Sequence, residues 1–156
     1  MNGLESLYQE LILDHSKRPH GKELADETGR TATSLQRNPV CGDEITLRVR
    51  VSDDGERVLD VTWDGAGCSI SQASASMLSA LVDELGEEAD GDGMPRADVD
   101  ARIEGFRAAL RSRGTVPLDE ETFADAAALS GVSKFTARVK CAMLAWVALE
   151  DALERA

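Results

Sequence analysis

The stretch Asn38-Pro39-Val40-Cys41-Gly42-Asp43 places a thiol and a carboxylate two residues apart, directly before a run of alternating apolar residues. In extended chain, residues i and i+2 point to the same side, so Cys41 and Asp43 are expected to face one point in space. Pro39 stiffens the approach, and Gly42 leaves the gap between the two side chains uncrowded. A soft ligand, the thiol, and a hard ligand, the carboxylate, that face one point indicate a metal site in which one ligand is more easily displaced than the others.

The residues that follow predict a β-hairpin. Apolar and polar residues alternate over 45–51 and again over 59–63, which is the period of a strand with one buried face. Between them, residues 52–56 contain an Asp-Gly turn signal. Residues 22–37 show no period and are predicted to form a loop, with a strand possible in 32–35.

Helical periodicity covers much of the remaining chain. It predicts helices over residues 4–16, from about 70 to Gly86, and from Val99 to about Arg113. Asp119 is expected to cap a short helix that ends at Ser130-Gly131-Val132, and Ser133 to cap the last helix. The stripe of that helix predicted to face the core is Phe135, Val139, Ala142, Trp146, Leu149 and Leu153.

Length and composition exclude several classes of protein. A chain of 156 residues is of the usual size for one domain, so residues 1–156 are expected to share one core. With 17 Lys and Arg against 29 Asp and Glu, the net charge of −12 argues against nucleic acid as a partner. Apolar runs fall short of the ~20 residues that span a bilayer. The N-terminus lacks a signal-peptide pattern, so we expect a cytoplasmic protein.

The three cysteines have two interpretations. In a reducing compartment, clustered thiols bind metal or do chemistry more often than they pair, but each could also be a small buried hydrophobe. Cys68 follows two glycines, just before a helix that opens with a capping-box pattern at Ser69-Ile-Ser-Gln72, and the positive end of the helix dipole favours a thiolate there. Cys141 lies beside the core stripe of the last helix, three residues after Arg138.

Together, Cys41, Asp43, Cys68 and Cys141 offer the four ligands of a tetrahedral zinc site. Three thiolates, one carboxylate and a divalent cation sum to −2, which is unfavourable to bury without a nearby cation. Arg138 and Lys140 are candidates for that role, although Lys140 is equally well interpreted as a solvated surface charge.

Two other kinds of site are disfavoured. Structural zinc sites usually take Cys and His in closely spaced pairs, and this sequence has no Cys-x-x-Cys. A cysteine hydrolase needs a histidine base, and the two histidines, His15 and His20, lie near the end of the first helix without an evident orienting partner. His15 is a possible ligand or proton carrier, but capping or packing at that helix end is favoured.

Three segments, 38–43, 65–76 and 134–146, resemble the signature segments of the IscU/NifU-N-like family of iron–sulfur cluster assembly proteins, in order and in flanking residues. The Leu7-Tyr8…Asp14-His15…Pro19 segment agrees as well. The scaffold branch of that family, IscU, typically has His before the third cysteine, where this chain has Lys140. Residues 86–118 look like the additional segment of the SufU branch.

The resemblance implies an α+β fold, with a small antiparallel sheet covered by an N-terminal helix and several C-terminal helices. It also implies a zinc site of Cys41, Asp43, Cys68 and Cys141. The implied activity is sulfur transfer: Cys41 accepts persulfide sulfur from a SufS-type cysteine desulfurase, and the sulfur passes toward the SufBCD machinery. Arg138 would support the charge or the docking. The alternatives are an IscU-like scaffold with an iron–sulfur cluster on the same ligands, and a zinc-stabilised, non-enzymatic activator of the desulfurase.

Overall fold

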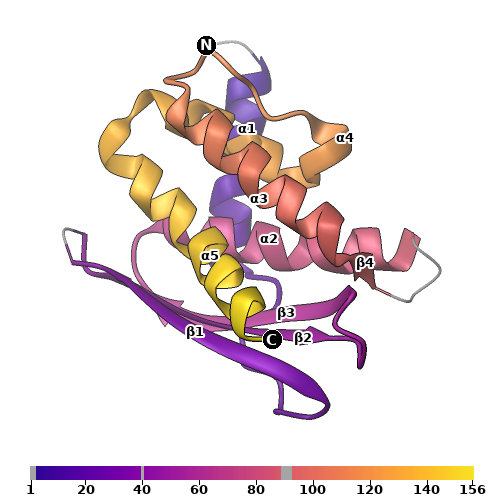
Figure 1. Cartoon of the computed structure of the whole chain (residues 1–156). Helices are drawn as coiled ribbons and strands as arrows, with labels where there is room; N and C mark the ends of the chain where they lie inside the picture. Colours follow the sequence, from indigo (N-terminus) through magenta and orange to yellow (C-terminus); the bar gives the residue numbers. More distant parts are fainter. Residues whose placement is uncertain (1–2, 40, 89–92) are drawn as a thin grey trace.

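The computed structural model describes residues 3–39, 41–88 and 93–156, the first three of them by backbone only (Figure 1). Helices and strands alternate irregularly along the chain, as in α+β proteins. The elements are α1 (Gly3–Lys17), β1 (Arg30–Asn38), β2 (Asp43–Val51), β3 (Arg57–Ala66), α2 (Ser69–Glu88), β4 (Met94–Pro95), α3 (Arg96–Arg111), α4 (Glu120–Phe123), the 3-10 helix η1 (Ala124–Lys134) and α5 (Thr136–Arg155).

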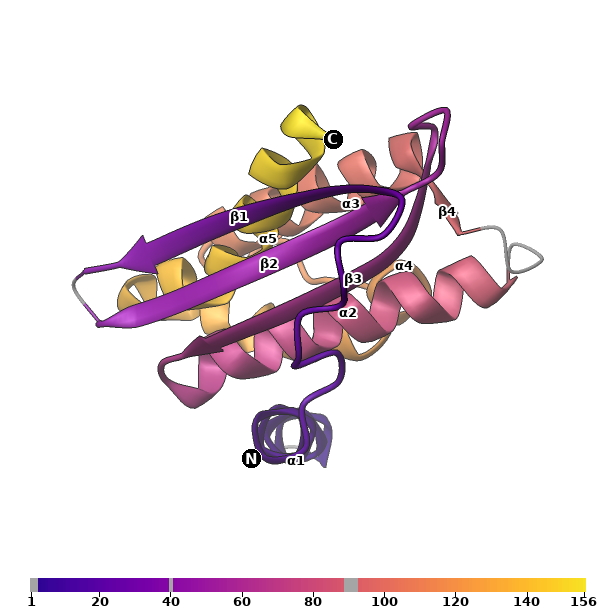
Figure 2. The same ribbon diagram turned by 90° about the horizontal axis from the view of Figure 1, so that it is seen from below.

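The four strands form one antiparallel sheet in the order β1-β2-β3-β4. Its inner face is covered by helices, with α2 along β3 and α5 behind β1 and β2 (Figure 2). The segment between α1 and β1 crosses the outer face, where Arg48 of β2 donates to the carbonyl of Ala25 at 2.6 Å. The sheet is therefore buried on one face and partly covered on the other.

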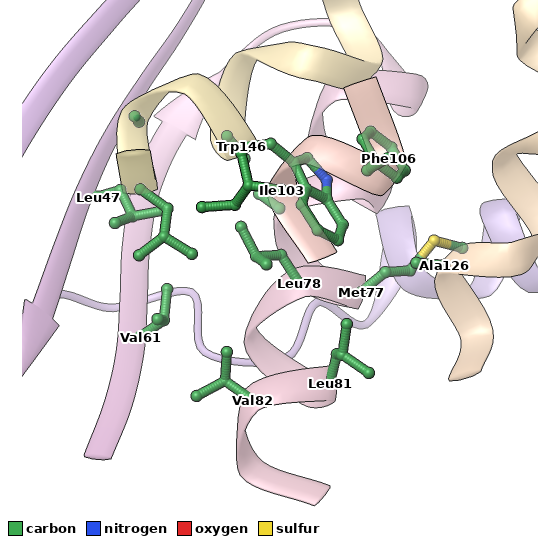
Figure 3. Packing of buried hydrophobic residues seen from close by; sticks show 14 of the residues in the cluster. Leu47, Val61, Met77, Leu78, Leu81, Val82, Ile103, Phe106, Ala126 and Trp146 are labelled. Carbon is green, nitrogen blue, oxygen red and sulfur yellow. The ribbon is translucent and has the colours of Figure 1, made fainter. Parts of the chain in front are cut away.

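The core lies between the sheet and the helices (Figure 3). The rings of Phe106 on α3 and Trp146 on α5 stack with their centroids 4.0 Å apart, and both side chains are fully buried. Trp146 Nε1 also donates to Ser74 Oγ of α2 at 3.0 Å, and this hydroxyl in turn donates to the carbonyl of Ala142 at 2.6 Å. These bonds fix α5 against α2 at the level of Cys141.

The predicted hairpin, the predicted helices and the α+β class are confirmed, with boundaries shifted by a few residues. The possible strand in residues 32–35 is confirmed and is longer than predicted, since Arg30–Asn38 pairs with β2 along its whole length. The prediction of a loop over residues 22–37 is therefore wrong from residue 30 onward. β1 is an edge strand whose buried positions carry polar side chains, Ser34 and Asn38, whereas Leu35 is 47% exposed, so its sequence lacks an apolar alternation.

The junction before α5 also differs from the prediction. Asp119 does cap α4, accepting a hydrogen bond from the Thr122 amide at 2.8 Å. The 3-10 helix, however, continues through the predicted break at residues 130–132, and Ser133 donates backward to the Ser130 carbonyl at 2.8 Å instead of capping α5. Phe135 precedes α5 and is 64% exposed, so its assignment to the core stripe is wrong.

No helix in the described part of the chain is both long and apolar enough to cross a bilayer.

Candidate metal centre

β1 ends at Asn38 and β2 begins at Asp43, and Cys41 and Gly42 lie in the turn between them; Val40 lies outside the described residues. Asn38 and Asp43 are paired across the two strands, and the Gly42 amide donates to the Asn38 carbonyl at 2.8 Å. Gly42 has φ +73°, a conformation that glycine adopts at little cost. The prediction that this stretch is extended is therefore wrong. A tight turn, and not the two-residue period of a strand, brings Cys41 and Asp43 together.

Three of the four predicted ligands converge closely. One ligand atom each from Cys41, Asp43 and Cys141 lies within 4.8 Å of the other two. The Cys41 and Cys141 Sγ atoms are 3.6 Å apart. Two thiolates bound tetrahedrally to zinc at about 2.3 Å are about 3.8 Å apart, so this separation suits a shared zinc ion.

Cys68 joins this group through Asp43. Its Sγ lies 3.9 Å from Asp43 Oδ2, and its backbone amide donates to Asp43 Oδ1 at 2.8 Å. The hydrogen bonds expected of a capping box are not the ones seen at the start of α2. Gln72 Nε2 donates to the Gly67 carbonyl at 3.0 Å, and the Asp43 carboxylate accepts the hydrogen bond from the Cys68 amide. Cys68 does not belong to the group of three residues whose ligand atoms all lie within 4.8 Å of one another.

Two glycines at the end of β3 allow this close approach. A Cβ atom on Gly67 would lie 2.3 Å from Asp43 Oδ1, and one on Gly65 would lie 2.1 Å from the Glu44 carbonyl oxygen. Both distances are far below van der Waals contact. The Gly65-Ala66-Gly67 sequence is therefore what lets the β3–α2 junction lie against the β1–β2 turn.

Cys141 enters the site from the second turn of α5, and its side chain is fully buried. Asn38 Nδ2 lies 4.0 Å from its Sγ and points a donor toward the sulfur. Burial, followed by hydrogen bonding with Asp43 and the other two thiols, raises the pKa of Cys141 well above its usual range. Without a cation this thiol stays protonated at neutral pH, whereas a bound divalent cation stabilises its thiolate.

The four donors differ sharply in exposure. Asp43 and Cys141 are buried, Cys68 is intermediate, and Cys41 is exposed at the tip of its turn. A partner approaching from solvent therefore meets Cys41 first.

The two cations predicted to support the site are at the surface. The side chains of Arg138 and Lys140 are exposed, and within the described part of the chain neither is hydrogen-bonded to a ligand of the cluster. The structure does bring in two polar side chains that the sequence did not single out. Asn38 lies beside Cys141, and Ser71 Oγ lies 3.8 Å from Cys68 Sγ. Both residues are polar but buried in the folded chain. A polar residue at a position expected to be buried is the only sequence signal that could have identified them.

Both histidines lie outside the site. His15 packs at the end of α1, with Nδ1 2.7 Å from Ser76 Oγ and Nε2 2.9 Å from Asp125 Oδ2. His20 Nε2 is 2.6 Å from Asp83 Oδ2. The packing role predicted for His15 is thus the one it has. Asp125, the carboxylate partner of His15, is 110 positions away in the sequence and could not be identified from it. Because Ser76 is fully buried, a substrate cannot reach the hydroxyl of this Ser-His-Asp arrangement.

The donor set fits zinc well. Three thiols with one carboxylate, converging from two turns and one helix, offer soft ligands together with one harder and more easily released ligand. The buried Asn38 amide faces a sulfur, as expected for a group that supports a metal thiolate.

Comparison with known proteins identifies the family of this chain. The NifU-like N-terminal domain matches residues 7–142. The zinc-dependent sulfurtransferase SufU of Bacillus subtilis is 36% identical over 152 residues, which covers 97% of this chain and 92% of that protein. The iron–sulfur cluster assembly scaffold protein IscU of Streptococcus pyogenes is also 36% identical, over 99% of this chain and 87% of that protein.

A crystal structure extends the likeness to three dimensions. The SufU protein of Fervidobacterium islandicum AW-1, described as an iron–sulfur cluster assembly scaffold for the SUF system, superposes with a TM-score of 0.68 at 29% identity. The superposition covers 97% of this chain and 99% of that one. The chain therefore belongs to the NifU-like N-terminal domain family of iron–sulfur cluster assembly proteins, which includes IscU and SufU.

Proposed function

We propose that this protein is a zinc-dependent sulfurtransferase of the SufU type. In this proposal it accepts persulfide sulfur from a SufS-type cysteine desulfurase and passes it toward the SufBCD assembly machinery. The observation that carries the proposal is the exposure of one thiol, Cys41, in a cluster of four metal-ligand side chains whose carboxylate and third thiol are buried.

Cys41, Asp43, Cys68 and Cys141 would hold the zinc ion. Zinc supplies no redox chemistry; when bound, it keeps its cysteine ligands deprotonated at neutral pH and protects them from oxidation. The protein contributes the asymmetry of the site. Asp43 is fixed by the Cys68 amide and Cys141 by its burial, whereas the turn that carries Cys41 faces solvent.

The transfer is a thiol–persulfide exchange. The Cys41 thiolate attacks the outer sulfur of the persulfide on the desulfurase cysteine. A sulfur–sulfur bond forms at Cys41 as the bond inside the donor persulfide breaks, and the donor cysteine leaves as a thiolate. No electrons are gained or lost overall, and Cys41 becomes the persulfide. Arg138, exposed one turn before Cys141, supports the charge of the site or the docking of the donor.

The test is sulfur loading. The zinc-bound protein is incubated with the desulfurase and cysteine, and its intact mass is measured without reductant. The wild-type protein is expected to gain sulfur on Cys41, located by peptide mapping. Cys41→Ala is expected to gain none and to stop stimulating the desulfurase. Full transfer by Cys41→Ala would show that another residue is the acceptor.

An iron–sulfur scaffold is the second candidate, supported by the identity to the scaffold protein IscU of Streptococcus pyogenes. Metal analysis of protein purified without reconstitution distinguishes the two. One zinc per chain and no visible absorption favour transfer, whereas a brown protein with bound iron and sulfide favours scaffolding. Zinc-bound protein that stimulates the desulfurase without gaining sulfur would instead be a non-enzymatic activator.

A further inference from the structure

A groove lies next to the metal centre, between the end of β1, the C-terminal part of α3 and the first half of α5. Its volume is about 670 Å³. α3 runs alongside α5 above the sheet (Figure 1). Residues of both helices line the groove together with residues 36–39.

The floor of the groove is apolar. Val139, Met143 and Val147 follow one another at four-residue spacing, which places them on one face of α5. Leu110 of α3 and Leu144 extend this floor. Such a surface accepts aliphatic or aromatic side chains.

The rim of the groove is cationic. Among the residues that the structure describes, no acidic residue lines the groove, whereas five of the chain's 17 Lys and Arg residues do: Arg37, Arg107, Arg111, Arg113 and Lys140. Two of them are compensated, Arg37 by Glu44 and Arg107 by Glu104 and Glu150. The other three make no side-chain hydrogen bond or ion pair to any residue that the structure describes. In a chain of net charge −12, this is a local positive potential that attracts an anionic partner.

Arg113 is held at this rim in an uncommon backbone conformation. Its φ is +56°, in the left-handed region where glycine is favoured, and Gly114 follows with φ +86°. A glycine at position 113 would relieve the strain but would remove the cation. The chain thus has an arginine at a position where the backbone conformation favours glycine.

The groove also borders the reactive thiol. Asn38, which lines it, is the residue whose amide lies 4.0 Å from Cys141 Sγ. Pro39 and Lys140 line it as well, two residues before Cys41 and one before Cys141. A segment seated in the groove would therefore lie beside the turn that presents Cys41.

We propose that this groove docks an acidic segment of the cysteine desulfurase, with apolar side chains on the floor and carboxylates at Arg111, Arg113 and Lys140. The identity of the partner rests on the proposed function, and the chemistry of the segment rests on the groove itself. Arg111 and Arg113 lie near the end of residues 86–118, so the C-terminal part of this segment serves partner recognition.

The test measures binding of the zinc-loaded protein to the desulfurase by isothermal titration calorimetry at low and at high salt. The probe variant is Arg111→Glu with Arg113→Glu. The matched control is Lys17→Glu with Arg18→Glu at the end of α1, which changes the net charge equally and also replaces exposed residues. The conservative variant is Arg111→Lys with Arg113→Lys.

We expect the groove reversal to weaken binding by at least about tenfold at low salt, with a smaller effect at high salt. The control and the conservative variant should bind like wild type. Arg113→Gly should weaken binding while keeping or raising the melting temperature, which separates recognition from folding. Zinc content should not change in any of these variants.

Equal binding by the groove reversal and wild type would overturn the groove assignment and leave sulfur loading of Cys41 standing. Absence of any binding between wild type and the desulfurase would overturn the partner, and the groove assignment with it.

Discussion

The carboxylate of Asp43 joins two loops, because its Oδ1 accepts the amide hydrogen of Cys68 at 2.8 Å while its Oδ2 lies 3.9 Å from Cys68 Sγ. One side chain thus fixes the start of α2 and contributes a metal ligand. These two roles can be separated by substitution.

Asp43→Asn keeps a carbonyl oxygen for the Cys68 amide but removes the charge and the anionic ligand. We expect it to fold like wild type and to bind zinc at least about 10-fold more weakly, as even supporting residues of metal sites contribute that much. Asp43→Ala should in addition lose about 1–3 kcal/mol of stability, since it leaves a part-buried amide unpaired. Competition with a zinc chelator and urea unfolding measure the two effects. Equal zinc affinity in Asp43→Asn and wild type would exclude Asp43 as a ligand.

Gly67→Ala should damage the site without touching a ligand. The new Cβ would lie 2.3 Å from Asp43 Oδ1, so the carboxylate or the β3–α2 junction must move. We expect zinc affinity to fall by about 10–100-fold and stability by about 1–3 kcal/mol.

Gly131→Ala is the matched control, since its Cβ meets no atom within 4 Å and its φ is not positive. This variant should bind zinc and unfold like wild type. Similar behaviour of the two alanine variants would mean that the close approach at Gly67 is not required.

The two histidines provide a matched pair for stability. The His15 ring is 11% exposed and links α1 to Ser76 and Asp125, whereas the His20 ring is 46% exposed and contacts Asp83 at the surface. His15→Ala should cost about 1–3 kcal/mol and His20→Ala less than about 1 kcal/mol, measured by urea unfolding. Zinc content should stay at the wild-type value in both. A larger loss in His20→Ala would contradict the packing role of His15.

Metal-free protein should lose stability at alkaline pH. Burial raises the pKa of Cys141 above the 9.0 of a free thiol, so above pH 9 the unfolded chain releases a proton that the folded chain retains. Stability is therefore full below pH 9 and falls as pH rises from there toward the folded pKa, by up to about 1.4 kcal/mol per pH unit.

The measurement is urea unfolding of chelator-treated protein between pH 8 and pH 10.5. Cys141→Ala removes the thiol and should flatten this slope. Because zinc displaces the thiol proton, zinc affinity of the wild type should rise with pH over the neutral range. A slope equal in wild type and Cys141→Ala would assign the alkaline loss to other groups.

Periodicity was a good guide where one face of an element is buried. The strands of the central hairpin and the long helices follow it closely, since burial in water selects apolar residues at the period of each element. It indicated only a possible strand in residues 32–35 for β1, because the pairing of Arg30–Asn38 depends on β2 and not on an apolar face. It also placed Phe135 in the core, because a helical stripe extrapolated beyond the helix start at Thr136 no longer has a core to face.

The sequence by itself determined which donors the site contains, since a thiol or a carboxylate is a metal ligand through its own chemistry, and the flanking glycines and proline mark where the backbone turns. The tertiary structure decided how those donors differ. Pairing of Asn38 with Asp43 closes the turn, packing of α5 on α2 buries Cys141, and Cys41 is left exposed. The exposure of each ligand and the grouping of cations along the groove depend on contacts between residues more than 100 positions apart, which local sequence patterns do not predict.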